Sequence, residues 1–325
     1  MADDAAVLDG GAEQFHPHDL DDPTWNESWL VSWLPADGRR AGLFRLGTLP
    51  GQGRAWLWLW LWTGEDWVTI EETRLAYDHL DRGDGVGYDR WGLSFSYRPT
   101  VALEKGRFRI DGIGLVRSGP REGRLVPVSV DLDLTATTGC FGTGAGHDEG
   151  RSTHPADRFE QSMAATGTVT VGGVVSSVDC PAHRDRSWGP RTWQYPFMLG
   201  DLQSADRQIY FGAGPNAEGG RGKGYVREGS DVVPLAAIGA EMAYDDQGAT
   251  IGRSRLFFTD ERGRQHAFEI EPIAPSVQFD MAHASDPPRH WLYWRTLVRA
   301  TPLDGGEVVV GWFEANRFPN AGEPD

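Results

Sequence analysis

The sequence predicts an all-β fold of two consecutive antiparallel β-barrel or half-barrel domains. Glycine (42 residues) and Trp (14 residues) are abundant, and runs with the apolar periodicity of a helix are hard to find. Segments rich in β-branched and aromatic residues instead alternate with turns that contain Gly, Asp and Pro. The length of 325 residues is enough for two domains with substantial cores.

The first half of the chain begins with an acidic, turn-rich stretch over residues 1–22, which is expected to form a flexible arm. An N-terminal β-barrel domain is expected over residues 23–165, where seven segments resemble strands. These segments are WLVSWL (29–34), RAGLFRLGTL (40–49), RAWLWLWLW (54–62), DWVTIEETRLAYD (66–78), YDRWGLSFSYR (88–98), VALEKGRFRIDGIGLV (101–116) and VPVSVDLDLTATT (126–138). Residues 139–162 are rich in Gly, Asp and His and have little periodicity, which predicts a long loop or linker.

The second half is expected to form a C-terminal β-barrel domain over residues 166–325, carrying the motif HRDRSWGPR. Eight further strand-like segments support it, with hairpin spacing typical of sandwiches or barrels. They are ATGTVTVGGVVSSVD (165–179), RQIYFGAG (207–214), GKGYVRE (222–228), DVVPLAAIGAEMAYD (231–245), RSRLFFTDERGRQHAFEIEPI (253–273), SVQFDMA (276–282), HWLYWRTLVRATP (290–302) and EVVVGWFEANR (307–317).

Charge and motif content disfavour several functional classes. With 31 Lys and Arg against 47 Asp and Glu, the formal net charge is -16, so nucleic acid is a poor candidate partner. Cys140 and Cys180 are the only cysteines and have no CxxC motif, so neither a disulfide framework nor a zinc site is indicated. There is no Walker loop, HExxH motif or G-x-S-x-G elbow, and therefore no cofactor and no metal is expected.

The apolar segments do not predict membrane insertion. The run over residues 56–62 is too short to cross a bilayer, and the N-terminal MADDAAVLDGG lacks the basic and then apolar start of a secretory signal. A cytoplasmic protein without stable membrane insertion is therefore expected, and a homodimer is compatible with the sequence.

The stretch AWLWLWLW places four indoles on one strand. Trp56, Trp58, Trp60 and Trp62 alternate with three leucines, so the indoles share one face of a strand and the leucines share the other. A strand with two apolar faces is buried on both. The indoles either fill a core or domain contact, or line a cavity that binds an apolar molecule.

The run DCPAHRDRSWGPRTWQY over residues 179–195 concentrates charged and aromatic side chains around a Gly-Pro turn. His183 and Asp185 lie two residues apart, so on an extended segment they point the same way and can share one proton or one water. The neighbouring arginines can pair with buried carboxylates. The run is either a catalytic cluster or a structural network of ion pairs at a barrel mouth.

The pattern His-x-Asp-x-Ser-Trp-Gly resembles the signature of the lipocalin-like superfamily. This superfamily includes carotenoid 1,2-hydratase (hydroxyneurosporene synthase), kievitone hydratase and the lipocalin-like Diels-Alderases. The resemblance implies two lipocalin-like domains with a hydrophobic cavity at or near their junction. It also implies that His183, Asp185 and Trp188 correspond to the His, Asp and Trp of the hydratase motif, and that Arg191 matches a WG-x-R extension.

Hydration of an alkene needs an acid that protonates carbon and a sheltered cation that water then attacks. A carboxyl group kept neutral by an apolar pocket can be that acid, as can a histidinium held by a carboxylate. We assign the acid to Asp185, proton tuning to His183, cation shielding to Trp188 and positioning to Arg191. The expected function is a cofactor-independent hydratase or dehydratase acting on an isoprenoid or similar hydrophobic molecule.

Two alternatives use the same scaffold. A pericyclic or cationic cyclase or isomerase would fold a flexible substrate into a reactive conformer, and a carrier would bind an apolar ligand without changing it. Further residues are expected to contact the ligand, with Glu314 also a candidate partner for a motif arginine. The predicted substrate-binding residues are Trp56, Trp58, Trp60, Trp62, Trp193, Tyr195, Trp291, Tyr293 and Glu314.

Overall fold

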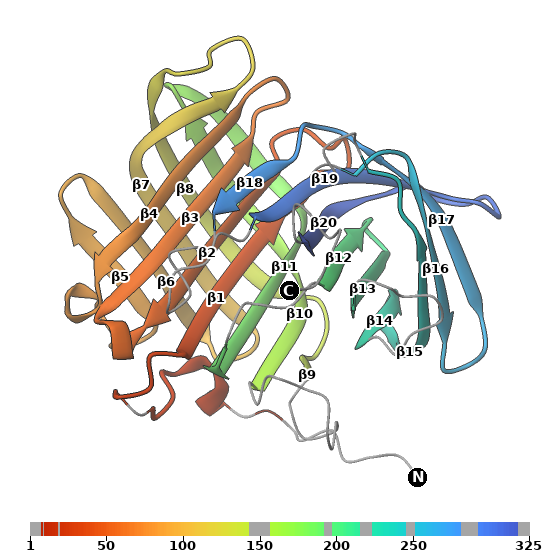
Figure 1. The fold of residues 1–325 in the computed structure, drawn as a ribbon, viewed down its shortest axis with the longest axis horizontal. Coiled ribbons are helices and arrows are strands. Elements are labelled where there is room, and N and C mark those ends of the chain that lie inside the picture. Colours follow the sequence, from red (N-terminus) through yellow and green to blue (C-terminus); the bar gives the residue numbers. More distant parts are fainter. Residues whose placement is uncertain are drawn as a thin grey trace, which may run out of the picture. The chain divides into compact units, whose positions relative to one another are not determined.

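The computed structural model describes residues 8, 10–18, 20–142, 157–191, 197–214, 223–244, 251–280 and 292–317. Within these ranges the chain is built of β-strands, and the helical segments are three short 3-10 helices, η1 (Gly10–Glu13), η2 (Pro50–Gln52) and η3 (Tyr77–His79) (Figure 1). The predicted all-β class is confirmed. No helix in the described part of the chain has the length and apolar composition needed to span a membrane.

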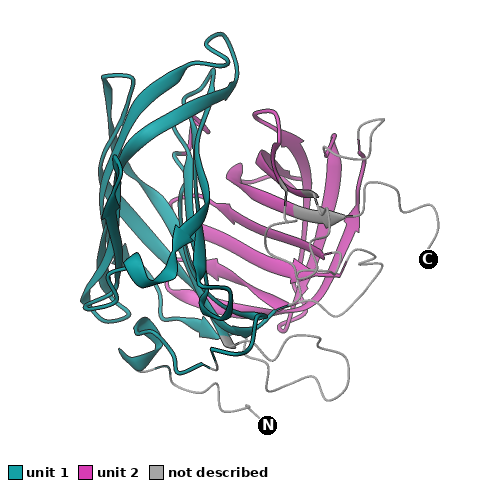
Figure 2. Ribbon diagram, turned by 60° about the vertical axis from the view of Figure 1, so that its left-hand side comes forward, with its two compact units in different colours: residues 1–35, 40–192 teal, residues 36–39, 193–325 magenta. Residues whose placement is uncertain are grey.

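The chain divides into two compact units (Figure 2). The first comprises Met1–Pro35 and Arg40–Thr192, and the second comprises Ala36–Arg39 and Trp193–Asp325. The domain boundary expected near residue 165 therefore precedes the end of the first unit, which is at Thr192. The hairpin that follows it, together with the HRDRSWGPR motif, belongs to the first unit.

The first unit contains an eight-stranded antiparallel barrel. Its strands are β1 (Trp25–Trp33), β2 (Gly42–Leu49), β3 (Arg54–Trp62), β4 (Trp67–Ala76), β7 (Lys105–Ser118), β8 (Leu125–Ala136), β10 (Asp157–Val171) and β11 (Val174–Pro190). They run in the order β4-β3-β2-β1-β11-β10-β8-β7, and pairing between β4 and β7 closes the ring. Strands β6 (Leu93–Val101) and β5 (Val86–Arg90) continue outward from β7, and the short β9 (Phe141–Gly142) pairs with β10.

The motif strand β11 joins the first barrel because both of its edges are paired there. Trp25 to Trp33 of β1 pair in register with Pro190 to Ala182, and β10 pairs along the other edge. Gly172 and Gly173 form the β10–β11 turn at φ +60° and +84°, a conformation that glycine adopts without strain. The segment expected to be a loop over residues 139–162 thus contains the start of β10.

The N-terminal segment also differs from the expected flexible arm. Within residues 10–18, Ala12 and Glu13 of η1 are buried. The Glu13 side chain accepts a hydrogen bond from the backbone N–H of Leu103 at 2.9 Å. This part of the arm is packed against the first barrel.

The second unit is a nine-stranded antiparallel sheet. Its strands are β12 (Phe197–Gln203), β13 (Arg207–Ala213), β14 (Lys223–Glu228), β15 (Asp231–Glu241), β16 (Ser254–Asp260), β17 (Gln265–Pro272), β18 (Val277–Asp280), β19 (Leu292–Pro302) and β20 (Val309–Arg317). The order is β17-β16-β15-β14-β13-β12-β20-β19-β18, and β17 also pairs with β19, so this ladder returns on itself.

The core of the first barrel explains the two apolar faces of β3. Leu57, Leu59 and Leu61 belong to the cluster of buried side chains inside the barrel, together with Trp29 and Phe44 of neighbouring strands. Because side chains alternate along a strand, the four indoles of β3 lie on the outer face of the barrel wall. The leucine face therefore belongs to the barrel core, and the indole face is buried outside that core.

Candidate functional site

Strand β11 presents different parts of the motif on its two faces. Cys180 and Ala182 belong to the barrel core, so the alternation continues inward through Arg184 and Arg186. His183 and Asp185 lie on the opposite, outer face, although both are buried, at 3 % and 6 % exposure. The predicted pair thus shares one face, as expected from its spacing.

The outer face holds a cluster of four charged or titratable side chains. Nε2 of His183 lies 2.6 Å from Oε2 of Glu160, which is fully buried on β10. Arg158 forms an ion pair with Glu160 and donates a hydrogen bond from Nη2 to Oδ2 of Asp185 at 2.5 Å. The other oxygen of Asp185, Oδ1, is buried and has no hydrogen-bond partner among the described residues.

The electrostatics of this cluster keep Asp185 ionised. Burial raises the pKa of Asp185, but nearby positive charges outweigh burial, so the pKa lies below its ordinary value of 3.8. These charges belong to Arg158, Arg45, Arg191 and His183. An ionised carboxyl group has no proton to donate, so these surroundings do not support the acid role expected for Asp185.

The indole row lies on the same outer face as the cluster. Strand pairing places Asp185 opposite Leu30 of β1, Leu30 opposite Arg45 of β2, and Arg45 opposite Trp58 of β3. At about 4.8 Å per strand, the backbones of Asp185 and Trp58 are about 14 Å apart along the sheet. The guanidinium of Arg45 bridges part of this span, because it lies 4.9 Å and 5.3 Å from the ring centroids of Trp56 and Trp58.

All four indoles are buried, and three of them form a row of ring contacts. The ring centroids of Trp56 and Trp58 are 5.3 Å apart, and those of Trp58 and Trp60 are 5.0 Å apart. Trp62 packs on Trp67 of β4 at 5.2 Å. The structure therefore brings the predicted substrate-binding indoles and the predicted catalytic pair to one face of one barrel.

Glu71 of β4 is a titratable group at the far edge of this indole row. It accepts a hydrogen bond from Nε1 of Trp60 at 3.0 Å. Burial raises the pKa of Glu71 above its ordinary value of 4.5, although the charge of Arg117 and the Trp60 hydrogen bond both lower it. No role for Glu71 was predicted from the sequence.

The inner face of β11 holds the N-terminal segment. Nη1 of Arg184 donates to Oε1 of Glu13 at 2.7 Å and to the Tyr97 hydroxyl at 2.5 Å. Nη2 of Arg186 donates to Oε1 of Glu27 at 2.8 Å. These buried ion pairs form a network like the structural alternative considered for the motif, and the outward-facing His183 and Asp185 are also paired, with Glu160 and Arg158.

Trp188 is on the wrong face for the role assigned to it. Trp188 lies two residues after Arg186 on β11, so its side chain faces inward as the arginines do. Its ring stacks on the ring of His16, with 3.8 Å between the centroids. Trp188 therefore does not shield a cation at Asp185. Arg191 follows the end of β11, and its positive charge contributes to the lowered pKa of Asp185.

The remaining predicted residues are in the second unit or outside the described residues. Trp193, Tyr195 and Trp291 lie outside the described residues. Glu314 forms an ion pair with Arg295, and Nε of Arg295 donates to the Tyr293 hydroxyl at 2.5 Å. The ion pair of Glu314 in the described part of the chain is thus with its neighbour on β19 and not with a motif arginine.

A comparison with models of protein families identifies the family of this chain. One model, described as a domain of unknown function (DUF7064), matches residues 10–319. The chain belongs to the DUF7064 family. A comparison with curated proteins finds no match to this DUF7064 chain.

Solved structures share the fold of this DUF7064 protein. A Nitrosomonas europaea protein described as AttH has a TM-score of 0.60 at 14% identity, over 96% of this chain and 99% of its own. Kievitone hydratase from Nectria haematococca has a TM-score of 0.57 at 12% identity, over 97% and 94%. CghA with bound Sch210972 has a TM-score of 0.55 at 15% identity, over 90% and 88%. The predicted resemblance to the lipocalin-like hydratases and Diels-Alderases is thus confirmed at the level of fold.

Glu160 and Arg158 are the site residues that sequence analysis missed in this DUF7064 protein. They lie in RFEQSM (158–163), where Phe159 and Met163 are buried toward the barrel and the charged residues alternate with them. That alternation is a strand signal. It was hidden because the preceding segment is rich in Gly, Asp and His.

Proposed function

We propose that this DUF7064 protein is a cofactor-independent hydratase or dehydratase that acts on an isoprenoid or similarly apolar small molecule. One observation carries the proposal. The buried cluster of Glu160, His183, Arg158 and Asp185 lies on the same outer face of the first barrel as the indole row. The fold shared with kievitone hydratase supports this reaction class.

The proton donor in this proposal is His183. Its ring contacts Glu160 at 2.6 Å and lies within electrostatic reach of the Asp185 carboxylate. Neighbouring carboxylates stabilise an imidazolium, which is then poised as a general acid. Sequence analysis offered a histidinium held by a carboxylate as one possible acid, and Glu160 supplies the carboxylate.

The base in this proposal is Asp185. During hydration, the imidazolium transfers its proton to one alkene carbon and the oxygen of a water molecule bonds to the other. Oδ1 of Asp185 accepts the proton that this water releases, and that proton then returns to His183. The net change is the addition of one water, and dehydration is the reverse sequence. Arg158 holds Asp185 through Oδ2, which leaves Oδ1 directed to the reaction.

The indole row supplies the apolar surface for the substrate. The four indoles are at most 8% exposed, so a terpenoid-sized molecule in contact with them would be shielded from water. Arg45 covers part of Trp56 and Trp58 and places a positive charge at this end of the indole row. The site thus combines apolar binding with a polar end.

The test uses water labelled with heavy oxygen. The full chain is incubated with a panel of terpenoids, prenylated phenols and polyketides, and each recovered ligand is analysed by mass spectrometry. Gain of one labelled water, or loss of one water, supports the proposal. An unchanged mass with altered retention indicates a cyclase or isomerase, as the shared fold with CghA would favour. Recovery of intact, bound ligand in every case indicates a carrier and refutes a catalytic role.

A further inference from the structure

The hairpin between β5 and β6 exposes a Trp in a strained conformation. Trp91 is 81% exposed and has φ +55°, and the following Gly92 has φ +79°. A two-residue turn with both φ values positive strongly favours Asn-Gly, because few other side chains tolerate this region. A bulky aromatic residue there is an outlier, and such strain points toward a function for the side chain.

Further apolar side chains are exposed on the strands that follow β6 across the sheet. Leu125, at 70% exposure, and Ile113 lie on the outer face of the β7–β8 hairpin, and Val174 and Val175 lie at the β10–β11 turn. Register places them at neighbouring levels of adjacent strands, because Ile113 pairs with Pro127 and Val128 pairs with Val171 beside the turn. We call Trp91, Ile113, Leu125, Val174 and Val175 the apolar rim.

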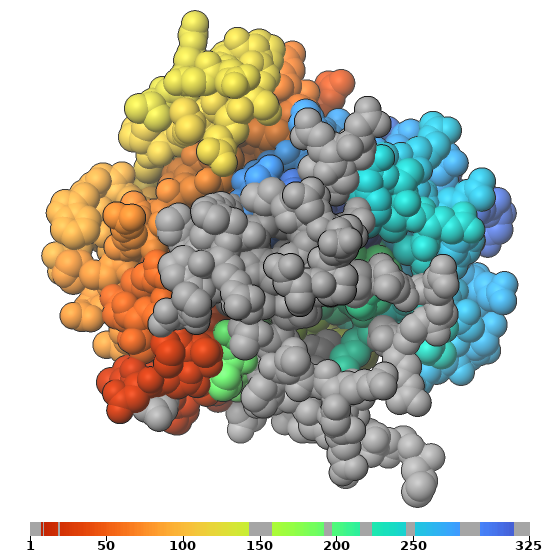
Figure 3. Space-filling model, in the orientation of Figure 1, coloured from red at the N-terminus to blue at the C-terminus, as the bar shows by residue number. Residues whose placement is uncertain are grey.

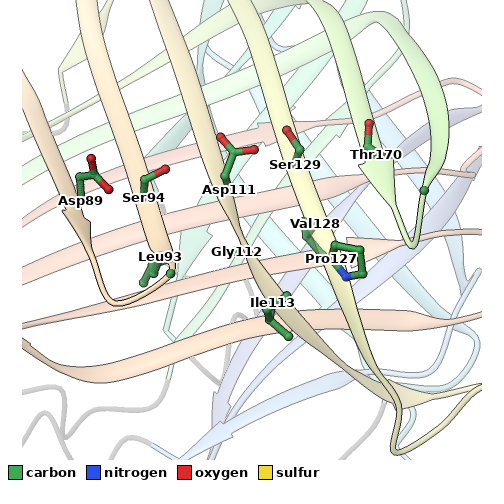
Figure 4. A pocket seen from close by; sticks show the side chains of 12 residues that line it. Asp89, Leu93, Ser94, Asp111, Gly112, Ile113, Pro127, Val128, Ser129 and Thr170 are labelled. Atoms are coloured by element: carbon green, nitrogen blue, oxygen red, sulfur yellow. The ribbon is translucent and has the colours of Figure 1, made fainter.

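The rim borders a shallow groove of about 460 Å³ across strands β5 to β10 (Figure 4). A row of polar side chains crosses this groove, namely Asp89, Ser94, Asp111, Ser129 and Thr170. Leu93, Ile113 and Pro127 lie nearer to the hairpin turns than this row does. The β7–β8 hairpin, in yellow, forms a projecting end of the first unit in the space-filling view (Figure 3). The apolar side chains are thus at the tips and the acidic ones are set back from them.

Arginines accompany the apolar rim. Residues 90–93, 113–127 and 172–175 contain four Arg and one Glu, while Asp89 and Asp111 line the groove beside them. Arg117 and Arg121 have acidic partners, Glu71 at 3.4 Å and Asp66 at 2.8 Å. Arg90 and Arg124 are exposed. Arginines beside exposed Trp and aliphatic residues match the phosphates and acyl chains of a phospholipid surface.

We propose that the apolar rim docks this protein on a phospholipid surface. Trp91 and Leu125 would enter the headgroup region, where the amphipathic indole is favoured, and Arg90 and Arg124 would contact lipid phosphates. Docking of this kind is peripheral and spans no bilayer. It would give access to apolar molecules dissolved in lipid, and it does not depend on which reaction the protein catalyses.

The test measures cosedimentation of the full chain with vesicles of phosphatidylcholine, with and without phosphatidylglycerol. The wild type is expected to bind, and more tightly when phosphatidylglycerol is present. Trp91→Asn is expected to weaken binding about tenfold or more, since a buried indole contributes a large apolar area. Because Asn tolerates positive φ, the same variant is expected to keep or raise the unfolding temperature. A loss of binding therefore cannot be ascribed to misfolding.

Two further variants complete the test. Arg124→Gln is expected to weaken binding about fivefold in the presence of phosphatidylglycerol only. Leu303→Ser removes an exposed apolar side chain of the second unit, in the turn that follows β19, and is expected to change nothing. Wild-type protein that stays in the supernatant with both kinds of vesicle overturns the proposal. So does a rim that instead mediates self-association, seen as a dimer that Trp91→Asn converts to monomer.

Discussion

Nε2 of His183 lies 2.6 Å from Oε2 of Glu160, across two adjacent strands of the first barrel. Both side chains are buried, and Glu160 also pairs with Arg158, which in turn holds Asp185. The motif His-x-Asp is therefore completed by a second strand. This arrangement separates the proposed proton donor, His183, from the Asp185 carboxylate, which nearby arginines keep ionised.

Glu160→Gln tests whether this contact is catalytic. Gln retains the shape and a hydrogen-bond acceptor but removes the charge that stabilises the imidazolium. If His183 is the acid, kcat is expected to fall about a hundredfold or more and its alkaline limb to move to lower pH, with ligand uptake unchanged. The measurement is kcat against pH on the substrate that the labelled-water screen identifies.

Asp131→Asn is the matched control for that experiment. Asp131 is on strand β8, on the outer face of the same barrel, and forms an ion pair with Arg107 at 3.0 Å. By strand register it is about 27 Å along the barrel from the cluster. Its replacement is expected to leave both kcat and the pH profile as in the wild type. A pH profile of Glu160→Gln that coincides with this control would remove His183 from the role of acid.

Asp185→Asn addresses the base and makes a prediction about acid stability. The folded-state pKa of Asp185 lies below 3.8, so its contribution to stability is complete above that value and is lost as pH falls through the folded pKa. Turnover of the variant is expected to be abolished at neutral pH. Its urea midpoint is expected to fall less than that of the wild type between about pH 5 and about pH 3. Equal falls in the two proteins would contradict the lowered pKa.

The fold class and the strand content could be predicted because they depend on local patterns. The alternation in AWLWLWLW predicted a strand with two apolar faces, and β3 has its leucines in the core and its indoles outside. The assignment of β11 to the first barrel could not be predicted in this way. It depends on pairing with β1, and no local pattern states which distant strand is the neighbour.

The candidate site shows the same limit. The spacing of His183 and Asp185 predicted that they share one face of a strand. The same alternation along β11 places Trp188 on the other face, although the motif resemblance grouped it with His183 and Asp185. Glu160 needed the pairing of β10 with β11. The protonation of Asp185 needed the positions of Arg158 and Arg45, which come from two further strands. Charge balance in a buried site is a property of tertiary structure.

The contact between Arg184 and Glu13 predicts a structural role for the N-terminal segment. Glu13→Ala leaves a buried guanidinium without its carboxylate partner, which is expected to lower the free energy of unfolding by about 3–5 kcal/mol. The segment over residues 10–18 should then be cleaved faster in limited proteolysis. Arg107→Ala breaks a half-exposed ion pair of the same barrel and is expected to cost about 1 kcal/mol or less. Equal effects of the two variants would argue against the segment being held by Arg184.

Glu71→Gln tests the environment at the far edge of the indole row. An acid whose folded-state pKa is raised binds its proton more tightly in the folded state, so stability rises as pH falls through that pKa. Glu71→Gln removes the ionisable group while keeping an acceptor for Nε1 of Trp60. The difference in unfolding free energy between the variant and the wild type, measured by urea unfolding, is therefore expected to favour the variant more at pH 7 than at pH 4. A variant that is relatively less stable at pH 7 would show that the ion pair with Arg117, at 3.4 Å, outweighs the burial of the carboxylate.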